Sequence, residues 1–172
     1  MNRNTLKQAL AGSAMVLAML AMSNVNAQST QDLDITAEVP EVCIIDVPTD
    51  ALMDFGVLNV LPAANFTQSA NFSWRCSFGT AITIAINAGL TGSVDNRIMA
   101  GPGPGLAYNL YTDTTYGNVW GDGTASTVIV TETGLGMALV GTSIIEGRIL
   151  IGDAEAAGAG IYNDTVTITM LP

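Results

Sequence analysis

Short runs that alternate apolar and polar side chains, separated by Gly, Asn, Asp and Pro, recur along this sequence after residue 30. In residues 80–88, for example, Ile82, Ile84 and Ile86 alternate with small or polar residues. A period of two places such side chains on one face of a β-strand. The expected strands cover residues 31–39, 42–47, 54–61, 70–78, 80–88, 106–111, 127–131, 143–151 and 162–170.

Many short strands at this spacing are typical of a β-sandwich or a β-barrel. No window combines a 3.6-residue apolar stripe with helix caps, and residues 153–160 are small and are expected to form a flexible loop. In residues 70–78, Phe72, Trp74, Cys76 and Phe78 are expected to share one buried face. The sequence therefore predicts an all-β fold.

Residues 1–27 are typical of a secretory signal peptide. Two cations, Arg3 and Lys7, precede an apolar run over residues 9–22, and small residues at Val25 and Ala27 predict cleavage after Ala27. The apolar run is shorter than the about 20 residues that span a bilayer. The remaining 145 residues suffice for one domain, and the protein is expected to be exported.

The charge of the mature chain excludes several classes of partner. Arg3 and Lys7 are two of the five cations, so cleavage leaves three cations against 15 acids, a net charge of −12. Nucleic acids and anionic membranes are bound largely through Lys and Arg, and we expect neither as a partner. The sequence contains no histidine, which rules out histidine acid–base catalysis and histidine metal sites.

Two cysteines, Cys43 and Cys76, lie in the exported part of the chain. In an oxidising compartment the default is a disulfide, here closing a 34-residue loop. A loop of this size is worth about 3–4 kcal/mol in the chain-entropy description. Two thiolates without a histidine fall short of the usual four zinc ligands, so no metal site is expected.

The last expected strand has one apolar face, formed by Val166, Ile168 and Met170. The sequence ends two residues later at Pro172, so no further strand is expected to cover this edge. An uncovered edge promotes aggregation unless another chain adds a strand to it. The polar face of the strand is formed by Thr165, Thr167 and Thr169.

The first expected strand precedes Cys43 and therefore lies outside the disulfide loop. Its apolar face consists of Leu33, Ile35, Ala37 and Val39, and Asp32, Asp34, Thr36 and Glu38 form its polar face. This strand either pairs within its own domain or is added to a sheet of another chain. The residue pattern alone leaves both alternatives open.

A set of short motifs follows in a characteristic order. They are Cys43, Cys76-Ser77-Phe78-Gly79, Asn87-Ala88-Gly89-Leu90, Asn96-Arg97-Ile98-Met99, Tyr108-Asn109-Leu110-Tyr111-Thr112-Asp113, Val119-Trp120-Gly121-Asp122-Gly123, Gly147-Arg148-Ile149 and Gly160-Ile161-Tyr162-Asn163-Asp164-Thr165-Val166. In their order and spacing the chain resembles the spore coat protein U domain family, which includes the Csu-type subunits of archaic chaperone–usher fimbriae. The resemblance runs over nearly the whole mature chain.

The resemblance implies an incomplete immunoglobulin-like β-sandwich that a donor strand from a neighbouring subunit completes. A periplasmic chaperone first lends a strand and delivers the subunit to an outer-membrane usher. Residues 28–39 would be the donor segment, with Leu33, Ile35, Ala37 and Val39 as its plugs, and residues 40–172 the pilin domain. The strand from Thr165 to Met170 would be the acceptor edge, which the chaperone occupies before assembly.

The implied function is that of a non-enzymatic structural subunit of a surface fimbria of a Gram-negative bacterium, with a role in adhesion and biofilm formation. Its partners would be copies of itself or sister pilins, the chaperone and the usher. No cofactor and no small-molecule substrate is expected. A single domain favours a shaft or minor subunit over a tip adhesin, which in this family carries an additional receptor-binding domain.

Other functions remain as alternatives. An enzyme would need a carboxylate pair such as Asp113 and Asp122, near Tyr111 and Trp120, although both aspartates are also typical turn residues. A secreted carbohydrate-binding module would use an exposed aromatic, for which Trp120 beside a turn is the candidate. Trp74 is expected near the disulfide in the core. A non-fimbrial surface coat protein is the third alternative.

Overall fold

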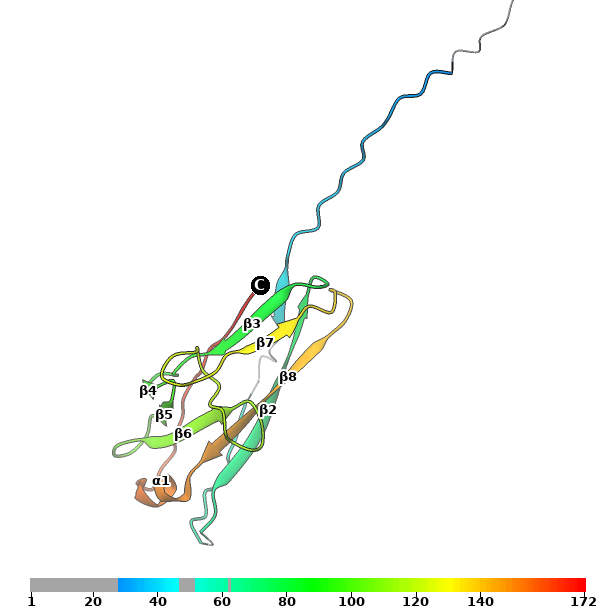
Figure 1. The fold of residues 1–172 in the computed structure, drawn as a ribbon. Helices are drawn as coiled ribbons and strands as arrows, with labels where there is room; N and C mark the ends of the chain where they lie inside the picture. The colour runs from blue at the N-terminus through cyan, green and yellow to red at the C-terminus, as the bar shows by residue number, and fades with distance from the viewer. Residues whose placement is uncertain (1–27, 47–51, 62) are drawn as a thin grey trace, which may run out of the picture. The chain divides into compact units, whose positions relative to one another are not determined.

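The computed structural model describes residues 28–46, 52–61 and 63–172. The expected signal peptide, residues 1–27, lies outside this part of the chain. The chain divides into two units, residues 1–37 and residues 38–172. Residues 28–37 of the first unit form neither helix nor strand, and every element described below belongs to the second unit (Figure 1).

The larger sheet has two long antiparallel strands at its centre, β2 (Phe66–Cys76) and β8 (Gly141–Ile149). They pair from Phe66 opposite Ile149 to Trp74 opposite Gly141. The strand order is β1-β2-β8-β6-β5-β4, with every neighbouring pair antiparallel. The remaining strands are β1 (Cys43–Asp46), β4 (Gly92–Ser93), β5 (Asn96–Met99) and β6 (Leu106–Tyr111).

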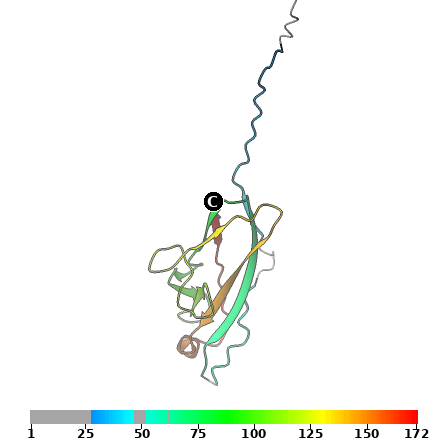
Figure 2. The same ribbon diagram turned by 45° about the vertical axis from the view of Figure 1, so that its right-hand side comes forward.

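The smaller sheet consists of β7 (Val130–Thr133), β3 (Ala81–Ile86) and β9 (Ile168–Leu171), in the order β7-β3-β9. Both pairs are antiparallel. Strand β9 is therefore an edge strand, and strand β1 is an edge of the larger sheet. Figures 1 and 2 show β3 and β9 in a separate layer from the long β2–β8 pair.

The core lies between these layers, since both sheets contribute buried apolar side chains to one cluster. The larger sheet provides Phe72, Trp74, Cys76, Leu106, Tyr108, Leu110, Ile145 and Ile149, and the smaller sheet provides Ile82, Ile84 and Ile86. Trp120, from the connection between β6 and β7, joins the same cluster. The prediction of an all-β fold is confirmed, and the arrangement is a β-sandwich of the immunoglobulin-like kind.

Most strand predictions with strong local alternation are confirmed, namely those for β1, β2, β3, β6 and β8. Strands β4 and β5 were not expected. The expected strand at 127–131 begins later, as β7 at Val130. Phe78 was expected on the buried face of β2, which is wrong, because β2 ends at Cys76 and Phe78 lies exposed in the following turn.

The expected strand over residues 54–61 is not formed among the described residues. Gly56 adopts a left-handed φ of 68°, and its N–H donates to Asp54 Oδ1 at 2.8 Å. This local turn interrupts the period-2 pattern, so that Phe55 and Leu58, three residues apart, both pack against the core. The residues of this segment alternate as in a strand, but the segment has no strand partner in the described part of the chain.

The short helix α1 (Ile151–Ala156) replaces the flexible loop expected at its position. Its sequence is small and has no apolar stripe, and only Ala154 is buried. The helix follows β8 directly and packs against β6. Within the described residues, no helix is long and apolar enough to cross a membrane.

Candidate functional site

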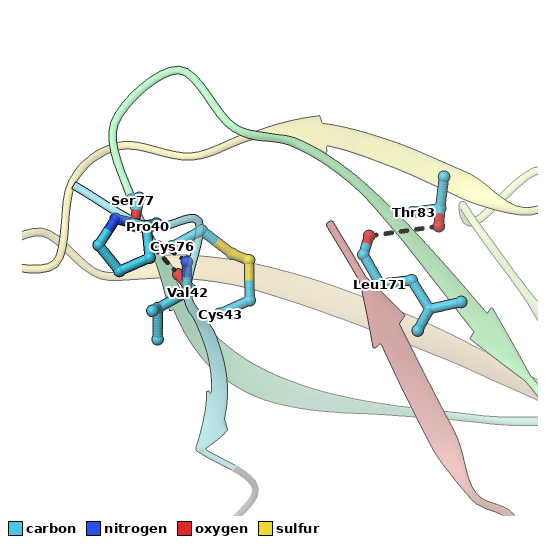
Figure 3. The surroundings of a disulfide bond; sticks show 7 residues. All are labelled: Pro40, Val42, Cys43, Cys76, Ser77, Thr83 and Leu171. Carbon is cyan, nitrogen blue, oxygen red and sulfur yellow. Dashed lines mark hydrogen bonds between the residues drawn. A yellow bond between two sulfur atoms is a disulfide. The ribbon is translucent and has the colours of Figure 1, made fainter. Parts of the chain in front are cut away.

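A disulfide between Cys43 and Cys76 joins β1 to β2, where the two cysteines stand opposite each other (Figure 3). This confirms the predicted pairing. Ser77, which follows Cys76, adds hydrogen bonds to the residues that precede Cys43. Its hydroxyl donates to the Pro40 carbonyl oxygen at 3.0 Å and accepts from the Val42 N–H at 3.1 Å, while its own N–H donates to the Val42 carbonyl oxygen at 2.9 Å. Residues 40–43 are therefore fixed to the end of β2.

The segment before this anchor makes no strand pairing in the described structure, and all of residues 28–39 are exposed. Leu33, Ile35 and Val39 are 83%, 85% and 84% exposed. Three large apolar side chains exposed in one short segment promote aggregation unless another surface receives them. The strand expected over residues 31–39 is not formed among the described residues.

A groove with a volume of about 970 Å³ opens into the core of residues 38–172. Its floor consists of side chains from both long strands and from β6, chiefly Phe72, Leu106, Leu110, Ile145 and Ile149. One rim is formed by residues 52–60 and the other by residues 158–168. The groove thus runs along the interior of the sandwich between two chain segments, and the side chains of its floor are buried.

Four apolar side chains of the rim at 52–60 pack against the core, namely Met53, Phe55, Leu58 and Val60. Two N–H groups in or beside this rim donate to nearby side chains, Gly56 N–H to Asp54 Oδ1 and Leu61 N–H to Asn59 Oδ1. Among the described residues, no backbone bond joins this rim to a strand. Its main-chain donors and acceptors are therefore available to an added strand.

The opposite rim keeps the alternation that the sequence predicts. Val166, Ile168 and Met170 are half-buried against the core, and Thr165, Thr167 and Thr169 are exposed. Only Ile168–Leu171 forms the strand β9, which is shorter than the strand expected over 162–170. The reason lies in its pairing, since β3 accompanies it only over Ile168 to Leu171.

Isolated backbone and side-chain hydrogen bonds hold the rest of this rim. The Asn87 N–H donates to the Thr167 carbonyl oxygen at 3.1 Å, and Asn87 Oδ1 accepts from the Thr167 N–H at 2.8 Å. Asn163 exchanges two backbone hydrogen bonds with Ala100, of 2.8 and 3.0 Å. In the described chain, no hydrogen bond joins this rim to residues 52–60 across the groove.

A buried arginine braces the region behind this rim. Arg97 is fully buried, and its guanidinium donates to the carbonyl oxygens of Asn87 (2.8 Å), Ile86 (3.1 Å) and Trp120 (2.8 Å). Burial lowers the pKa of Arg97, and nearby Tyr108 and Asp164 oppose this shift. A charged group that satisfies three backbone carbonyls ties the end of β3 to the segment around Trp120.

Tyr108 and Asp164 link the floor of the groove to its rim. The Tyr108 hydroxyl donates to Asp164 Oδ2 at 2.7 Å, and Asp164 Oδ1 accepts from the Leu90 N–H at 2.7 Å. Burial, followed by the hydrogen bond and the charge of Asp164, raises the pKa of Tyr108. The sequence motifs containing Asn87, Arg97, Tyr108 and Asp164 thus hold the groove in shape, a role that was not predicted from the residue pattern.

The structure contradicts the expectation of an exposed Trp120. Its side chain is 1% exposed, and its Nε1–H donates to the Ile84 carbonyl oxygen at 2.9 Å. The turn at Asp122 was taken to place the ring outside, but the chain around it folds back onto β3 and β6. Trp120 therefore offers no sugar-binding platform. Trp74 is buried as expected, and it donates to Ser143 Oγ at 3.1 Å.

The two aspartates considered for catalysis form local turns. Asp113 Oδ1 accepts from the Thr115 N–H at 2.7 Å, and Asp122 Oδ1 accepts from the Thr124 N–H at 2.9 Å. Hydrogen bonds from these threonines lower the pKa of both carboxyl groups. Both residues thus act as turn formers. Within the described chain, no group of three or more acidic or cysteine residues is placed to hold a metal ion.

Comparisons with known proteins agree with this fold. The sequence profile of the spore coat protein U domain matches residues 29–169. Among solved structures, the chain is similar to one chain of the CsuC–CsuE chaperone–tip adhesion subunit pre-assembly complex from archaic chaperone–usher Csu pili of Acinetobacter baumannii. The TM-score is 0.54 at 21% sequence identity. This similarity covers 77% of the present chain but only 40% of the other.

No curated protein matches the sequence. The profile, however, spans all nine strands except the last two residues of β9, and it also includes most of the exposed segment before Cys43. The motifs that hold the groove lie within the matched range. The chain therefore belongs to the spore coat protein U domain family.

Proposed function

We propose that this protein is a structural subunit of a chaperone–usher fimbria. Its subunits join by donor-strand complementation, in which residues 28–39 of one copy fill the groove of the next. The supporting observation is that one chain carries both an unfilled groove into its core and an unpaired segment with a row of exposed apolar side chains.

The proposed donor segment is short. The plugs Leu33, Ile35, Ala37 and Val39 span six residue steps, or about 20 Å in an extended strand at roughly 3.3 Å per residue. Since the two rims lack hydrogen bonds to each other among the described residues, an inserted strand would pair with both.

The apolar plugs account for the strength of the joint. Full burial of a large aliphatic side chain is worth about 1.5–3 kcal/mol, so Leu33, Ile35 and Val39 together contribute several kcal/mol before ordering costs. The polar face with Asp32, Asp34 and Glu38 keeps the free segment soluble before assembly. Sequence and groove thus provide a directional, head-to-tail contact.

The groove must be covered before assembly, and we propose a periplasmic chaperone that pairs with the acceptor edge Thr165 to Met170. The similar solved structure contains a chaperone bound to a pilus subunit. Delivery would proceed through an outer-membrane usher to a fimbria on the surface of a Gram-negative bacterium. A fibre of such subunits would serve adhesion and biofilm formation.

Deletion of residues 28–39 tests this function. The deleted segment makes no contact that the groove needs, so the subunit should still accumulate in the periplasm in complex with its chaperone, while surface fibres are lost. The measurement is fibre yield on the cell surface together with the amount of chaperone-bound subunit. Normal fibres, or loss of the chaperone complex, would show that the segment has another role.

A further inference from the structure

Phe78 has an exposure that neither the fold nor the donor-strand joint explains. It lies at the tip of the turn between β2 and β3 and is 87% exposed. Gly79 supplies the left-handed φ of 79° that this turn needs, but any polar residue would serve at position 78. A bare phenylalanine at a turn tip points to a contact with another surface.

Phe78 belongs to a larger apolar surface. The loop at 134–140 runs alongside the turn, with hydrogen bonds from Gly79 N–H to Gly134 O (2.9 Å) and from Gly136 N–H to Cys76 O (3.0 Å). The exposed side chains of this loop include Leu135, Met137 and Leu139. We call the four residues Phe78, Leu135, Met137 and Leu139 the turn patch.

The turn patch lies where the donor segment leaves its domain. Ser77, next to Phe78, holds Pro40 and Val42 by its hydroxyl and its N–H, and Pro40 directly follows the last plug, Val39 (Figure 3). Consecutive Cα atoms are about 3.8 Å apart. Once Val39 occupies the groove of a neighbouring copy, the end of that groove must therefore lie within a few residues' reach of Phe78.

The groove rim of such a copy offers a matching surface. Leu52, Val57 and Ile161 line the groove, yet their side chains are exposed, with Val57 95% exposed. We infer that the turn patch of one copy packs against the apolar groove rim of the copy that receives its donor segment. This second contact rests on the proposed function and would fix the angle between consecutive subunits, which the donor strand alone leaves free at residues 39–40.

The test is site-specific photo-crosslinking in assembled fibres. Phe78 is replaced by a benzophenone-bearing phenylalanine, and Ile144, an exposed apolar residue in the middle of β8, is replaced in the same way as the matched control. After irradiation, mass spectrometry should find the residue-78 probe joined to peptides of residues 52–61 or 158–166 from another copy. The probe at residue 144 should not join to these peptides.

The outcomes separate this inference from the proposed function. Two results would overturn the inference without affecting the proposed donor-strand joint. In both, fibres form normally with the probe, but the probe is joined either to no rim peptide or to the chaperone instead. Absence of fibres from the unmodified protein would overturn the proposed function. As a second variant, Phe78→Ser should still assemble, since its donor segment and groove are intact, but with a wider spread of angles between subunits in electron micrographs. An unchanged spread contradicts the inference.

Discussion

At the scale of single residues, the shape of the groove depends on polar side chains. They form hydrogen bonds with backbone segments beyond the ends of the strands. Asn87 replaces ladder bonds for Thr167, and Arg97 satisfies the carbonyl oxygens of Ile86, Asn87 and Trp120. Such groups are costly to bury unless every partner is present. The residues that shape the groove are thus more sensitive to substitution than those on its outer surface.

Arg97→Leu should destabilise the fold by several kcal/mol. It leaves three carbonyl oxygens near the core without their donor, at about 1–3 kcal/mol each. The measurement is the amount of chaperone-bound subunit in the periplasm, which should fall sharply. Arg75→Leu is the matched control, because Arg75 is exposed on β2. Equal amounts of the two variants would contradict a bracing role for Arg97.

The phenol of Tyr108 predicts a loss of stability in alkali. Its pKa in the folded chain is raised above the ordinary value of 10.0, so the folded state disfavours the phenolate. The contribution is complete below about pH 10 and is lost as the pH rises from there toward the raised folded pKa. Between about pH 8 and pH 11, the urea midpoint of the purified protein should fall less for Tyr108→Phe than for the unchanged chain. Parallel declines would exclude Tyr108 as a source of this effect.

At the scale of elements, the disulfide joins an edge strand of only four residues to the long strand β2. Replacing both cysteines by serine should cost about 2–5 kcal/mol and leave no reactive thiol. Less chaperone-bound subunit should then accumulate, as quantified by immunoblot of the periplasm. Unchanged amounts would show that the hydrogen bonds of β1 and Ser77 suffice.

The sequence predicted strands well where burial alternates along the strand with the period-2 pattern of apolar residues, as for Ile82, Ile84 and Ile86 of β3. The prediction failed where contacts with residues distant in the sequence determine the local structure. Residues 54–61 have a strand-like composition, but they lack a partner in the described chain and turn at Gly56. Trp120 is buried by contacts with Ile84, 36 residues away, which no local pattern contains.

The alternating faces of residues 31–39 and 162–170 were recognised in the sequence, but the groove between residues 52–60 and 158–168 was not. It depends on the rim at 52–60, on core residues from three strands and on the segment at 158–168, which are remote in sequence. Arg97 gave a weak signal as one of three cations expected in the mature chain, placed within an otherwise strand-like motif. Its hydrogen-bond partners could not be deduced without the fold.

At the scale of the whole molecule, the proposed function makes the protein a repeating unit, with the exposed segment before Cys43 as donor and the groove of its domain as acceptor. Contact between unlike surfaces of identical subunits generates an open fibre when the rotation between subunits does not close a ring. We propose that the row of apolar side chains in residues 33–39, rather than the presence of the segment alone, makes this contact.

The most direct measurement compares two variants that each add one carboxylate to adjacent positions of the donor segment. Ile35→Asp places the charge on the apolar face, where burial in a neighbour's groove would cost several kcal/mol, whereas Thr36→Asp places it on the water face. Surface fibres should be lost for Ile35→Asp and remain near normal for Thr36→Asp, with equal chaperone-bound subunit in the periplasm for both. Normal fibres from the Ile35→Asp subunit would contradict the account.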